Sequence, residues 1–193
     1  MAGDGLTPRG EEAVKRAAEL VARYDSLFVG VGIAGRCAVL AQRLNPALTV
    51  VFESGIVGAA LSAPPRSISD RRLYERCRYV APQEEIFDCW LGGRRIDAAV
   101  VGAAQVDLHG RVNTTVIGSY AAPRARLTGA GGAPEVRPRR AAVVLLAAAN
   151  GRVVESVDFV TYRLPDDIDR WLVTDLGVWH ARSGEQRLVA VTP

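Results

Sequence analysis

The 193-residue sequence predicts an α/β fold, with an open, mostly parallel sheet and helices on both faces. Helical and strand patterns alternate over the first 52 residues, and two largely apolar runs, typical of buried strands, follow at 96–101 and 142–148. Strands joined through a helix within so few residues must lie parallel, with a right-handed crossover. No shift in composition divides the chain, so we expect a single domain over residues 1–193.

Caps, spacing and stop signals predict the individual elements. Thr7 can cap a helix that begins at Pro8, because proline in the first turn loses no needed donor. Apolar residues then recur at helical spacing (Val14, Ala17, Ala18 and Val21). We next expect a strand over 27–31, a helix over 34–44 stopped by Asn45-Pro46, a strand over 48–52, and a helix capped by Ser69 that carries Leu73, Cys77 and Val80.

A long segment, 102–141, separates the last two predicted strands and is rich in glycine, asparagine and threonine. We expect this segment to lack regular structure. Such a stretch inside a compact domain is more often functional than not, so we look for functional residues within it.

Composition excludes several classes of protein. Hydrophobic residues make up 49% and charged residues 23% of the chain, which excludes a disordered protein. The longest apolar run, 141–149, is too short for a membrane span. The segment 1–12 is charged and lacks an apolar core, so we expect no secretory signal and a cytoplasmic protein.

Neither a metal nor nucleic acid is an expected ligand. The cysteines (Cys37, Cys77 and Cys89) are odd in number and lack metal-ligand spacing, which argues against a zinc site and against a disulfide framework. The net charge is only +3, and the dispersed basic residues have no aromatic platform for bases. The arginine-rich run 137–140 is expected to be a solvated loop, with phosphate binding as the alternative.

A glycine-rich turn, Gly30-Val31-Gly32-Ile33-Ala34-Gly35, follows one predicted strand and opens a predicted helix, and Glu53 ends the next strand. Together they fit a dinucleotide-binding fingerprint, in which glycines admit a pyrophosphate and the acid binds a ribose. The competing interpretation is that glycine simply permits a tight turn between strand and helix.

Glu53 is followed by a second glycine-rich turn, Ser54-Gly55-Ile56-Val57-Gly58. This turn would hold the carboxylate over the strand ends, where ligands bind in open α/β sheets. A ribose-binding acid needs no such turn, whereas a carboxylate nucleophile benefits from one. Glu53 is therefore a candidate nucleophile, and the competing interpretation from these residues alone is a solvated loop glutamate.

Four blocks, in this order, resemble the β subunits of class I coenzyme A transferases, most closely the glutaconate CoA-transferase type. They are the glycine turn at 30–35, Glu-Ser-Gly at 53–55, the A-Q-x-D…G-x-V-N block at 104–113 and the G-x-G-G loop at 129–132. The segments 65–67 (Pro-Arg-Ser) and 158–161 (Asp-Phe-Val-Thr) resemble the family too, so the resemblance spans about residues 8–180.

The resemblance implies that Glu53 attacks an acyl-CoA and forms a glutamyl-CoA thioester, which exchanges CoA between two acids. It implies that the backbone amides of Gly131 and Gly132 stabilise the oxyanion. It also places Gly30 and Gly32 in the wall that binds CoA.

Three further residues are expected to support the site. They are Ser54, Gln105 and Asn113, and for the two amides a purely structural role is an equal alternative. The implied ligands are acyl-CoA and a small, possibly dicarboxylic acid. In the loop after Glu53, Arg66 is the one obvious carboxylate partner, and an anchor for the loop is an equal alternative. The implied partner is an α subunit of the same family, in a heterodimer or an α2β2 assembly, with no membrane partner.

Other functions stay open. A hydrolase or decarboxylase acting on CoA thioesters shares this fold, but retention of Glu53 favours transfer; a dinucleotide-binding protein is the third possibility. No serine aligns with His109, expected in a surface turn, or with His180, so a Ser-His-Asp enzyme is not favoured. The sequence departs from the family pattern in two places. It has Ile33-Ala34 where many relatives have proline, and it ends at Pro193, earlier than the longer β subunits. The second departure predicts that part of the pocket is absent or supplied elsewhere.

Overall fold

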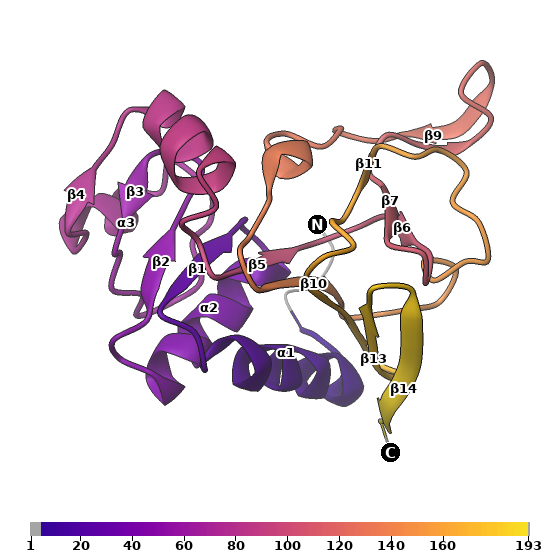
Figure 1. The fold of residues 1–193 in the computed structure, drawn as a ribbon, viewed down its shortest axis with the longest axis horizontal. Helices are drawn as coiled ribbons and strands as arrows, with labels where there is room; N and C mark the ends of the chain where they lie inside the picture. The colour runs from indigo at the N-terminus through magenta and orange to yellow at the C-terminus, as the bar shows by residue number, and fades with distance from the viewer. Residues whose placement is uncertain (1–4, 193) are drawn as a thin grey trace.

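A nine-stranded sheet forms the centre of the molecule, in the order β14-β13-β12-β10-β5-β1-β2-β3-β4 (Figure 1). The computed structural model describes residues 5–192. Residues 1–4 and Pro193 lie outside the described residues. The expectation that the segment 1–12 is not a secretory signal therefore falls partly outside them. Within the described residues, no helix is both long and apolar enough to cross a membrane.

The five central strands are parallel and the edge strands are antiparallel, which confirms the predicted fold class. The parallel strands are β2 (Thr49–Val51), β1 (Ser26–Val29), β5 (Ala98–Val101), β10 (Ala141–Leu146) and β12 (Asp169–Thr174). The antiparallel strands are β3 (Ile56–Val57) and β4 (Tyr79–Val80) at one edge, and β13 (Gly177–Arg182) and β14 (Glu185–Val191) at the other. The strand order reverses at β1, because β2 lies on one side of it and β5 on the other.

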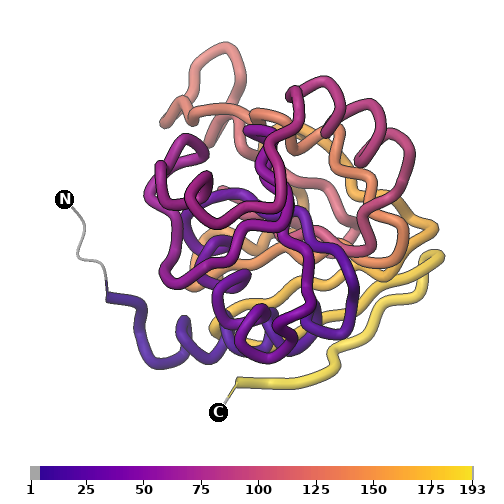
Figure 2. Tube along the Cα trace, turned by 90° about the vertical axis from the view of Figure 1, so that its left-hand side faces the viewer, coloured from indigo at the N-terminus to yellow at the C-terminus, as the bar shows by residue number. Residues whose placement is uncertain are grey.

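Two long helices cover one face of the sheet. They are α1 (Pro8–Val21) and α2 (Ile33–Leu44), and the Thr7 hydroxyl caps α1 by accepting from the Gly10 amide at 3.1 Å, as predicted. Alternate residues of the buried strands, such as Leu27 and Val29, point into this layer. Although they are far apart in sequence, α1 and the strand β12 pack together, and the indigo helix lies near the yellow C-terminal strands (Figure 2).

The opposite face is covered by two different structures. Over β1 and β2 lies a π-helix, η1 (Glu85–Gly92), whose Ile86 and Leu91 pack on Phe28. Over β10 and β12 lies a three-stranded sheet, which consists of β6 (Gln105–Val106), β7 (Arg111–Asn113) and β11 (Tyr162–Arg163). Helices thus lie on both faces, and strands complete the second one.

The prediction of a helix that Ser69 caps and that extends to Val80 was wrong in both its cap and its length. The helix α3 spans only Arg71–Glu75, and Asp70 caps it by accepting from the Arg72 amide. Val80 pairs with Ile56 in strand β4 instead. The apolar spacing resembled a helix, but the last apolar residue belongs to the sheet edge.

The expectation that 102–141 lacks regular structure was also wrong. Besides β6 and β7, the segment contains the hairpin of β8 (Val116–Gly118) and β9 (Pro123–Arg126) and the 3-10 helix η2 (Ala133–Glu135). Its strands are only two to four residues long, so their apolar alternation is too brief to detect in sequence.

Candidate active site

Glu53 lies at the carboxyl edge of the parallel strands, two residues beyond the end of β2. Phe28 of β1 is aligned with both Val51 of β2 and Ala99 of β5, so the loops after these three strands emerge at the same edge. The strand order reverses at β1, and the ligands of open α/β sheets bind at the carboxyl edge beside such a reversal. Glu53 is therefore placed where the sequence predicted it.

A tight turn holds Glu53 at this edge. The Gly55 amide donates to the Phe52 carbonyl at 3.1 Å, and the Phe52 amide donates to the Ile56 carbonyl at 3.0 Å. Gly55 has φ +92, and a Cβ there would lie only 2.0 Å from the Ala81 carbonyl oxygen. The turn therefore requires glycine twice over, for its backbone conformation and for the close approach of Ala81.

The glycine loop at 129–132 reaches the Glu53 carboxylate. A Cβ built on Gly131 would lie 3.8 Å from Glu53 Oε2, and one built on Gly132 would lie 3.1 Å from the same oxygen. In the described part of the chain, the amides of Gly131 and Gly132 donate no hydrogen bond. Two unpartnered amide donors thus belong to the residues that flank the carboxylate.

Phe87 is a site residue that the sequence analysis missed. It lies on η1, and its Cζ would be 2.4 Å from a Cβ on Gly132. The aromatic ring and the carboxylate of Glu53 therefore flank the same glycine. No local signal marked Phe87, because only the packing of η1 beside η2 brings it to the site.

Gly30 and Gly32 lie at the same edge, after β1, and shape the entry into α2. Gly32 is the N-cap of α2 with φ +70 and ψ −128, a conformation open essentially to glycine alone. No atom lies within 4 Å of a Cβ built on either glycine. Gly35, by contrast, packs on Pro65, whose Cδ would be 2.8 Å from its Cβ. The first two glycines therefore border open space, and the third serves packing.

Gln105 and Asn113 form no hydrogen bond with Glu53, but form a buried network with each other. Asn113 Nδ2 donates to Gln105 Oε1 at 2.8 Å and to the Val116 carbonyl at 2.6 Å. Gln105 Nε2 donates to Asp158 Oδ2 at 3.1 Å. Hydrogen bonds from the Gly118 amide and then from Gln105 hold the pKa of Asp158 below its ordinary value. The structural alternative for both amides fits this arrangement.

The network is nevertheless connected to the glycine loop. Beyond Asn113, the Thr114 amide donates to Thr161 Oγ1 at 2.9 Å, and the Thr114 carbonyl accepts from the Gly129 amide at 3.0 Å. Gly129 begins the loop that flanks Glu53. The buried amides therefore anchor the segment from which the loop extends.

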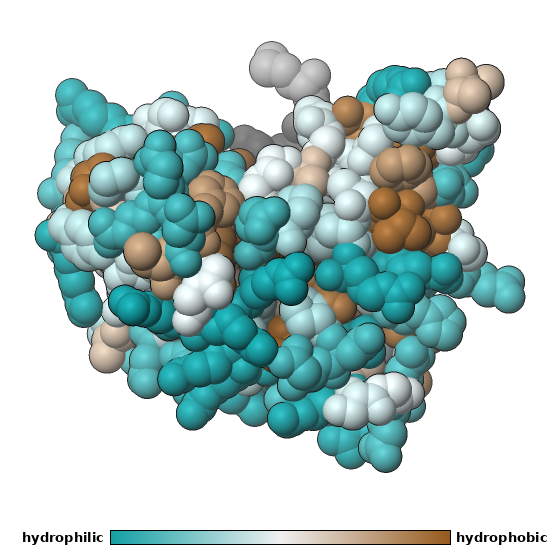
Figure 3. Space-filling view, turned by 45° about the horizontal axis from the view of Figure 1, so that its top comes forward, coloured by the Kyte–Doolittle hydropathy of each residue, from teal (hydrophilic) through white to brown (hydrophobic). Residues whose placement is uncertain are grey.

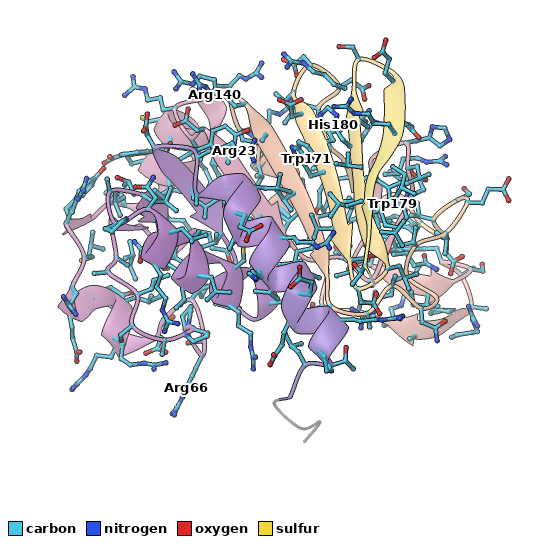
Figure 4. All side chains as sticks on the ribbon, turned by 90° about the horizontal axis from the view of Figure 1, so that it is seen from below. Arg23, Arg66, Arg140, Trp171, Trp179 and His180 are labelled. Atoms are coloured by element: carbon cyan, nitrogen blue, oxygen red, sulfur yellow. The ribbon has the colours of Figure 1, made fainter. Side chains whose placement is uncertain are left out.

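The remaining predicted residues have separate surroundings. The Ser54 hydroxyl is buried and has no hydrogen-bond partner among residues 5–192. Arg66 is exposed and points away from the body of the protein (Figure 4). His109 lies in a surface turn, as predicted, while His180 bonds Asp169 at 2.7 Å and lies against Trp171. Across the described residues, no group of three or more His, Cys, Asp or Glu side chains is arranged to hold a metal ion.

The arginine run at 137–140 is not simply a solvated loop. The Arg139 guanidinium bonds the buried carboxylate of Asp97, which also accepts from the Ser26 hydroxyl at 3.2 Å. This cluster joins β1, β5 and the start of β10 at the amino edge of the sheet, opposite Glu53. Its role is structural.

The face that carries η1, η2 and the β8–β9 hairpin is brought forward in Figure 3. Residues of intermediate hydropathy, shown in white, lie between two projecting lobes on this face. Small residues such as glycine leave backbone groups accessible, which suits a site that works through main-chain amides.

Two curated proteins are similar in sequence to this chain. The chain is 43% identical over 136 residues to the B subunit of 3-oxoadipate CoA-transferase from Pseudomonas knackmussii, a match that covers 69% of this chain and 52% of that protein. It is 30% identical over 170 residues to the B subunit of glutaconate CoA-transferase from Acidaminococcus fermentans, a match that covers 78% of this chain and 64% of that protein. The chain thus spans between half and two thirds of the length of these relatives.

Solved structures show the same fold. Glutaconate coenzyme A-transferase from Acidaminococcus fermentans superposes with a TM-score of 0.81 at 25% identity, over 95% of this chain and 78% of that one. The decarboxylase AibA/AibB superposes with a TM-score of 0.76 at 27% identity, over 95% and 77% of the two chains. The model of the coenzyme A transferase family matches residues 11–188 of this chain. The chain that places Glu53 beside a glycine loop therefore belongs to the coenzyme A transferase family.

Proposed function

We propose that this chain is the glutamate-bearing subunit of a CoA-transferase that moves CoA between an acyl-CoA and a small organic acid. The observation that carries the proposal is the pairing of the Glu53 carboxylate with Gly131 and Gly132, whose amides have no partner in the described chain. A nucleophile and a pair of oxyanion donors are the two parts that acyl transfer requires.

In the first step, a carboxylate oxygen of Glu53 attacks the thioester carbonyl of an acyl-CoA. The carbonyl electron pair moves onto oxygen and gives a tetrahedral oxyanion. When that intermediate collapses, the carbon–sulfur bond breaks, CoA thiolate leaves, and a mixed anhydride of Glu53 and the acyl group remains.

In the second step, the thiolate attacks the glutamyl carbonyl of the anhydride. The original acid leaves as its carboxylate, and Glu53 becomes a glutamyl-CoA thioester. An incoming carboxylate then repeats the two steps in reverse order and departs as the new acyl-CoA. No proton or electron is gained or lost overall, so the cycle needs no further reactant.

The Gly131 and Gly132 amides would stabilise each oxyanion by hydrogen bonding. Removal of one such donor typically costs about 3–4 kcal/mol of transition-state stabilisation. Glycine suits this role because no Cβ keeps the reacting carbonyl away from the main chain.

A second protein of the same family is the proposed partner. Both curated relatives are named as the B subunits of their enzymes, which implies a companion subunit for each. The buried Ser54 hydroxyl beside Glu53 has no partner within residues 5–192, and it is available to a group supplied by such a companion or by the substrate.

Decarboxylation of a CoA thioester is the second candidate, favoured by the structural similarity to the decarboxylase AibA/AibB. It needs no acceptor acid, whereas transfer does. Release of carbon dioxide from a dicarboxylic acyl-CoA without an acceptor would therefore favour decarboxylation. Release of free acid under the same conditions would favour hydrolysis, and tight NAD binding without a CoA effect would favour the dinucleotide alternative.

The direct test is to trap the covalent intermediate. Incubation of the co-expressed subunits with an acyl-CoA and no acceptor should add the mass of CoA, less one water, to this chain. Borohydride should then reduce the Glu53 thioester to an alcohol, which peptide mapping locates.

Substitutions make the assignment specific. Glu53→Gln should abolish the adduct and lower exchange by several orders of magnitude with little change in Tm, because it keeps size and removes the nucleophile. Glu53→Asp should also be badly impaired, since it withdraws the carboxylate by one methylene. The matched control is Glu155→Gln, at an exposed position, which should behave as wild type. An adduct on another residue, or near-normal exchange by Glu53→Gln, would refute the assignment.

A further inference from the structure

A separate open cavity of about 660 Å³ lies at the amino edge of the sheet, away from Glu53. Its lining residues include His109, Arg163, Asp166, Arg170, Ser183 and Gly184. Arg170 is the second residue of β12, and the first residue of that strand is aligned with the first residue of the parallel strand β10. Glu53 instead follows the end of β2. The cavity therefore lies at the edge of the sheet opposite to the proposed catalytic site.

Arg170 is the buried cation of this cavity, with only 6% of its surface exposed. Its Nη1 donates to the His109 carbonyl at 3.1 Å and lies 2.5 Å from Asp166 Oδ1. Its Nη2 makes no hydrogen bond with residues 5–192 and, in contrast to Nε, is not fully buried. A guanidinium is always charged, and buried polar groups are normally hydrogen-bonded. Nη2 is therefore a donor that an anion in the cavity would satisfy.

The A-Q-x-D…G-x-V-N block of the sequence forms the seat of this arginine. Gly110 has φ +77, and a Cβ there would lie 2.6 Å from Arg170 Nη1. Asp107 fixes the turn before β7 by accepting from the His109 amide at 2.9 Å. Only glycine lets the guanidinium approach this turn so closely. The two buried amides at the other end of the block anchor the glycine loop, so the turn has a separate role at the opposite edge.

Other donors of the cavity also lack partners. The Arg163 guanidinium, on β11, is exposed and forms no hydrogen bond or ion pair with the described residues. The Ser183 hydroxyl and the Gly184 amide, in the turn between β13 and β14, donate no hydrogen bond within residues 5–192. The Ser183 amide donates to the Asp166 carbonyl at 3.1 Å, which fixes this turn beside the segment that follows β11. Donors from three separate parts of the chain thus line one cavity.

Positive charge exceeds negative charge around the cavity. Asp166 is the one acidic side chain among the described residues that line it, and Arg170 already pairs with it. The Asp166 side chain is 61% exposed, so water screens this pair and leaves part of the Arg170 charge uncompensated. Arg163 has no counterion in the described chain. An anion is therefore the ligand that this cavity favours.

We infer that the amino-edge cavity binds a phosphate group, with Arg170 as its buried anchor and Arg163 as its second guanidinium. Arginine binds phosphate in a bidentate manner, and the tetrahedral oxygens accept hydrogen bonds from several directions at once. A carboxylate offers only two oxygens in one plane. The phosphate comes either from inorganic phosphate or from a small phosphate monoester, and the open cavity admits both. This inference goes beyond the transfer proposed for Glu53 and does not depend on it.

The experiment measures binding of radiolabelled inorganic phosphate to the full chain by equilibrium dialysis at constant ionic strength. We expect saturable binding, with displacement by glycerol 3-phosphate but not by acetate at the same concentration. The relative affinities of inorganic phosphate and glycerol 3-phosphate then identify which source the cavity prefers.

Variants locate the site. Arg163→Gln removes an exposed side chain without a described partner, so it should weaken phosphate binding by about 10-fold or more and leave the Tm without phosphate unchanged. Ser183→Ala should also weaken binding, because it removes one donor. The matched controls are Arg76→Gln, an exposed position after α3, and Arg124→Gln in the β8–β9 hairpin that leads into the glycine loop. Both should bind phosphate as wild type does.

Four results would overturn the inference. Phosphate that does not bind saturably at millimolar concentrations would exclude the site, and displacement by acetate as effective as that by phosphate would exclude phosphate as its ligand. Normal binding by Arg163→Gln would mean that the cavity is not the site. A loss in Arg124→Gln instead would place the phosphate on the Glu53 side of the sheet. Trapping of the Glu53 adduct is measured separately, so failure of either proposal is recognised without the other.

Discussion

The substitution Gly132→Ala is the sharpest test of the site geometry. Gly132 has φ −80 and ψ 2, which any residue can adopt, so backbone strain contributes nothing. The added Cβ would lie 2.4 Å from Phe87 Cζ and 3.1 Å from Glu53 Oε2. Carbon atoms pack at about 3.5–4.0 Å, so the loop or the ring must move by about 1 Å.

That displacement sets the expected magnitude. A 1 Å misplacement of a reacting group can cost about 100-fold in rate, and overpacking costs about 1–3 kcal/mol of stability. We therefore expect exchange to fall by about 100-fold, and the Tm to fall by roughly 2–4 °C for each kcal/mol in a domain of this size. The assay is incorporation of a labelled acid into acyl-CoA by the co-expressed subunits, with Tm measured in parallel.

Two matched variants separate steric displacement from general damage. Gly129→Ala adds a Cβ in open space at φ +89, so it should lower Tm through strain and leave exchange much closer to wild type. Phe87→Leu combined with Gly132→Ala removes the aromatic contact and should recover part of the lost rate. The reasoning is refuted if Gly132→Ala exchanges within 3-fold of wild type, or if the double variant is no faster than the single one.

Three further predictions concern stability. Gly55→Ala should cost about 3 kcal/mol or more, because its Cβ would lie 2.0 Å from the Ala81 oxygen at φ +92, and Tm should fall by roughly 6–12 °C. Asn113→Ala should cost about 2–4 kcal/mol in urea unfolding, because it leaves buried partners unsatisfied. Burial disfavours the charged form of Asp97, but Arg139 and other donors outweigh it and lower its pKa. Ionised Asp97 therefore stabilises the folded state fully at pH values above the pKa of an unfolded aspartate, about 3.9. This stabilisation is lost as the pH falls through the lower pKa of Asp97 in the folded state.

Each of these predictions has a control. Gly151→Ala, at φ +67 in open space, should cost less than Gly55→Ala. Exposed Asn150→Ala should leave the free energy of unfolding nearly unchanged, in contrast to Asn113→Ala. Asp97→Asn should lower stability at neutral pH and reduce its dependence on acid, whereas the exposed Asp88→Asn should preserve the wild-type profile. An unaltered acid profile in Asp97→Asn would contradict the assigned ion pair.

The amino-acid sequence alone determined the parts of this protein that depend on neighbouring residues. The cap at Thr7, the glycine at the start of α2 and the stop at Asn45 are local signals, and each marked an element within one or two residues. The apolar runs of β1, β5 and β10 predicted buried parallel strands, because only such strands are apolar on both faces. Glu53 could be placed at a strand end for the same reason.

Only the tertiary structure decided what surrounds Glu53. The family resemblance pointed to Gly131, but its closeness to the carboxylate, and the presence of Phe87 beside Gly132, come from segments remote in the sequence, and no periodic pattern encodes a contact between separate elements. The same limit explains why Val80 was misassigned to a helix, since its strand pairing with Ile56 depends on the fold. Gln105 and Asn113 were recognised by motif, but their partners became clear only when folding brought them to the loop at Asp158. Local propensity specifies elements, whereas packing of distant segments specifies a site.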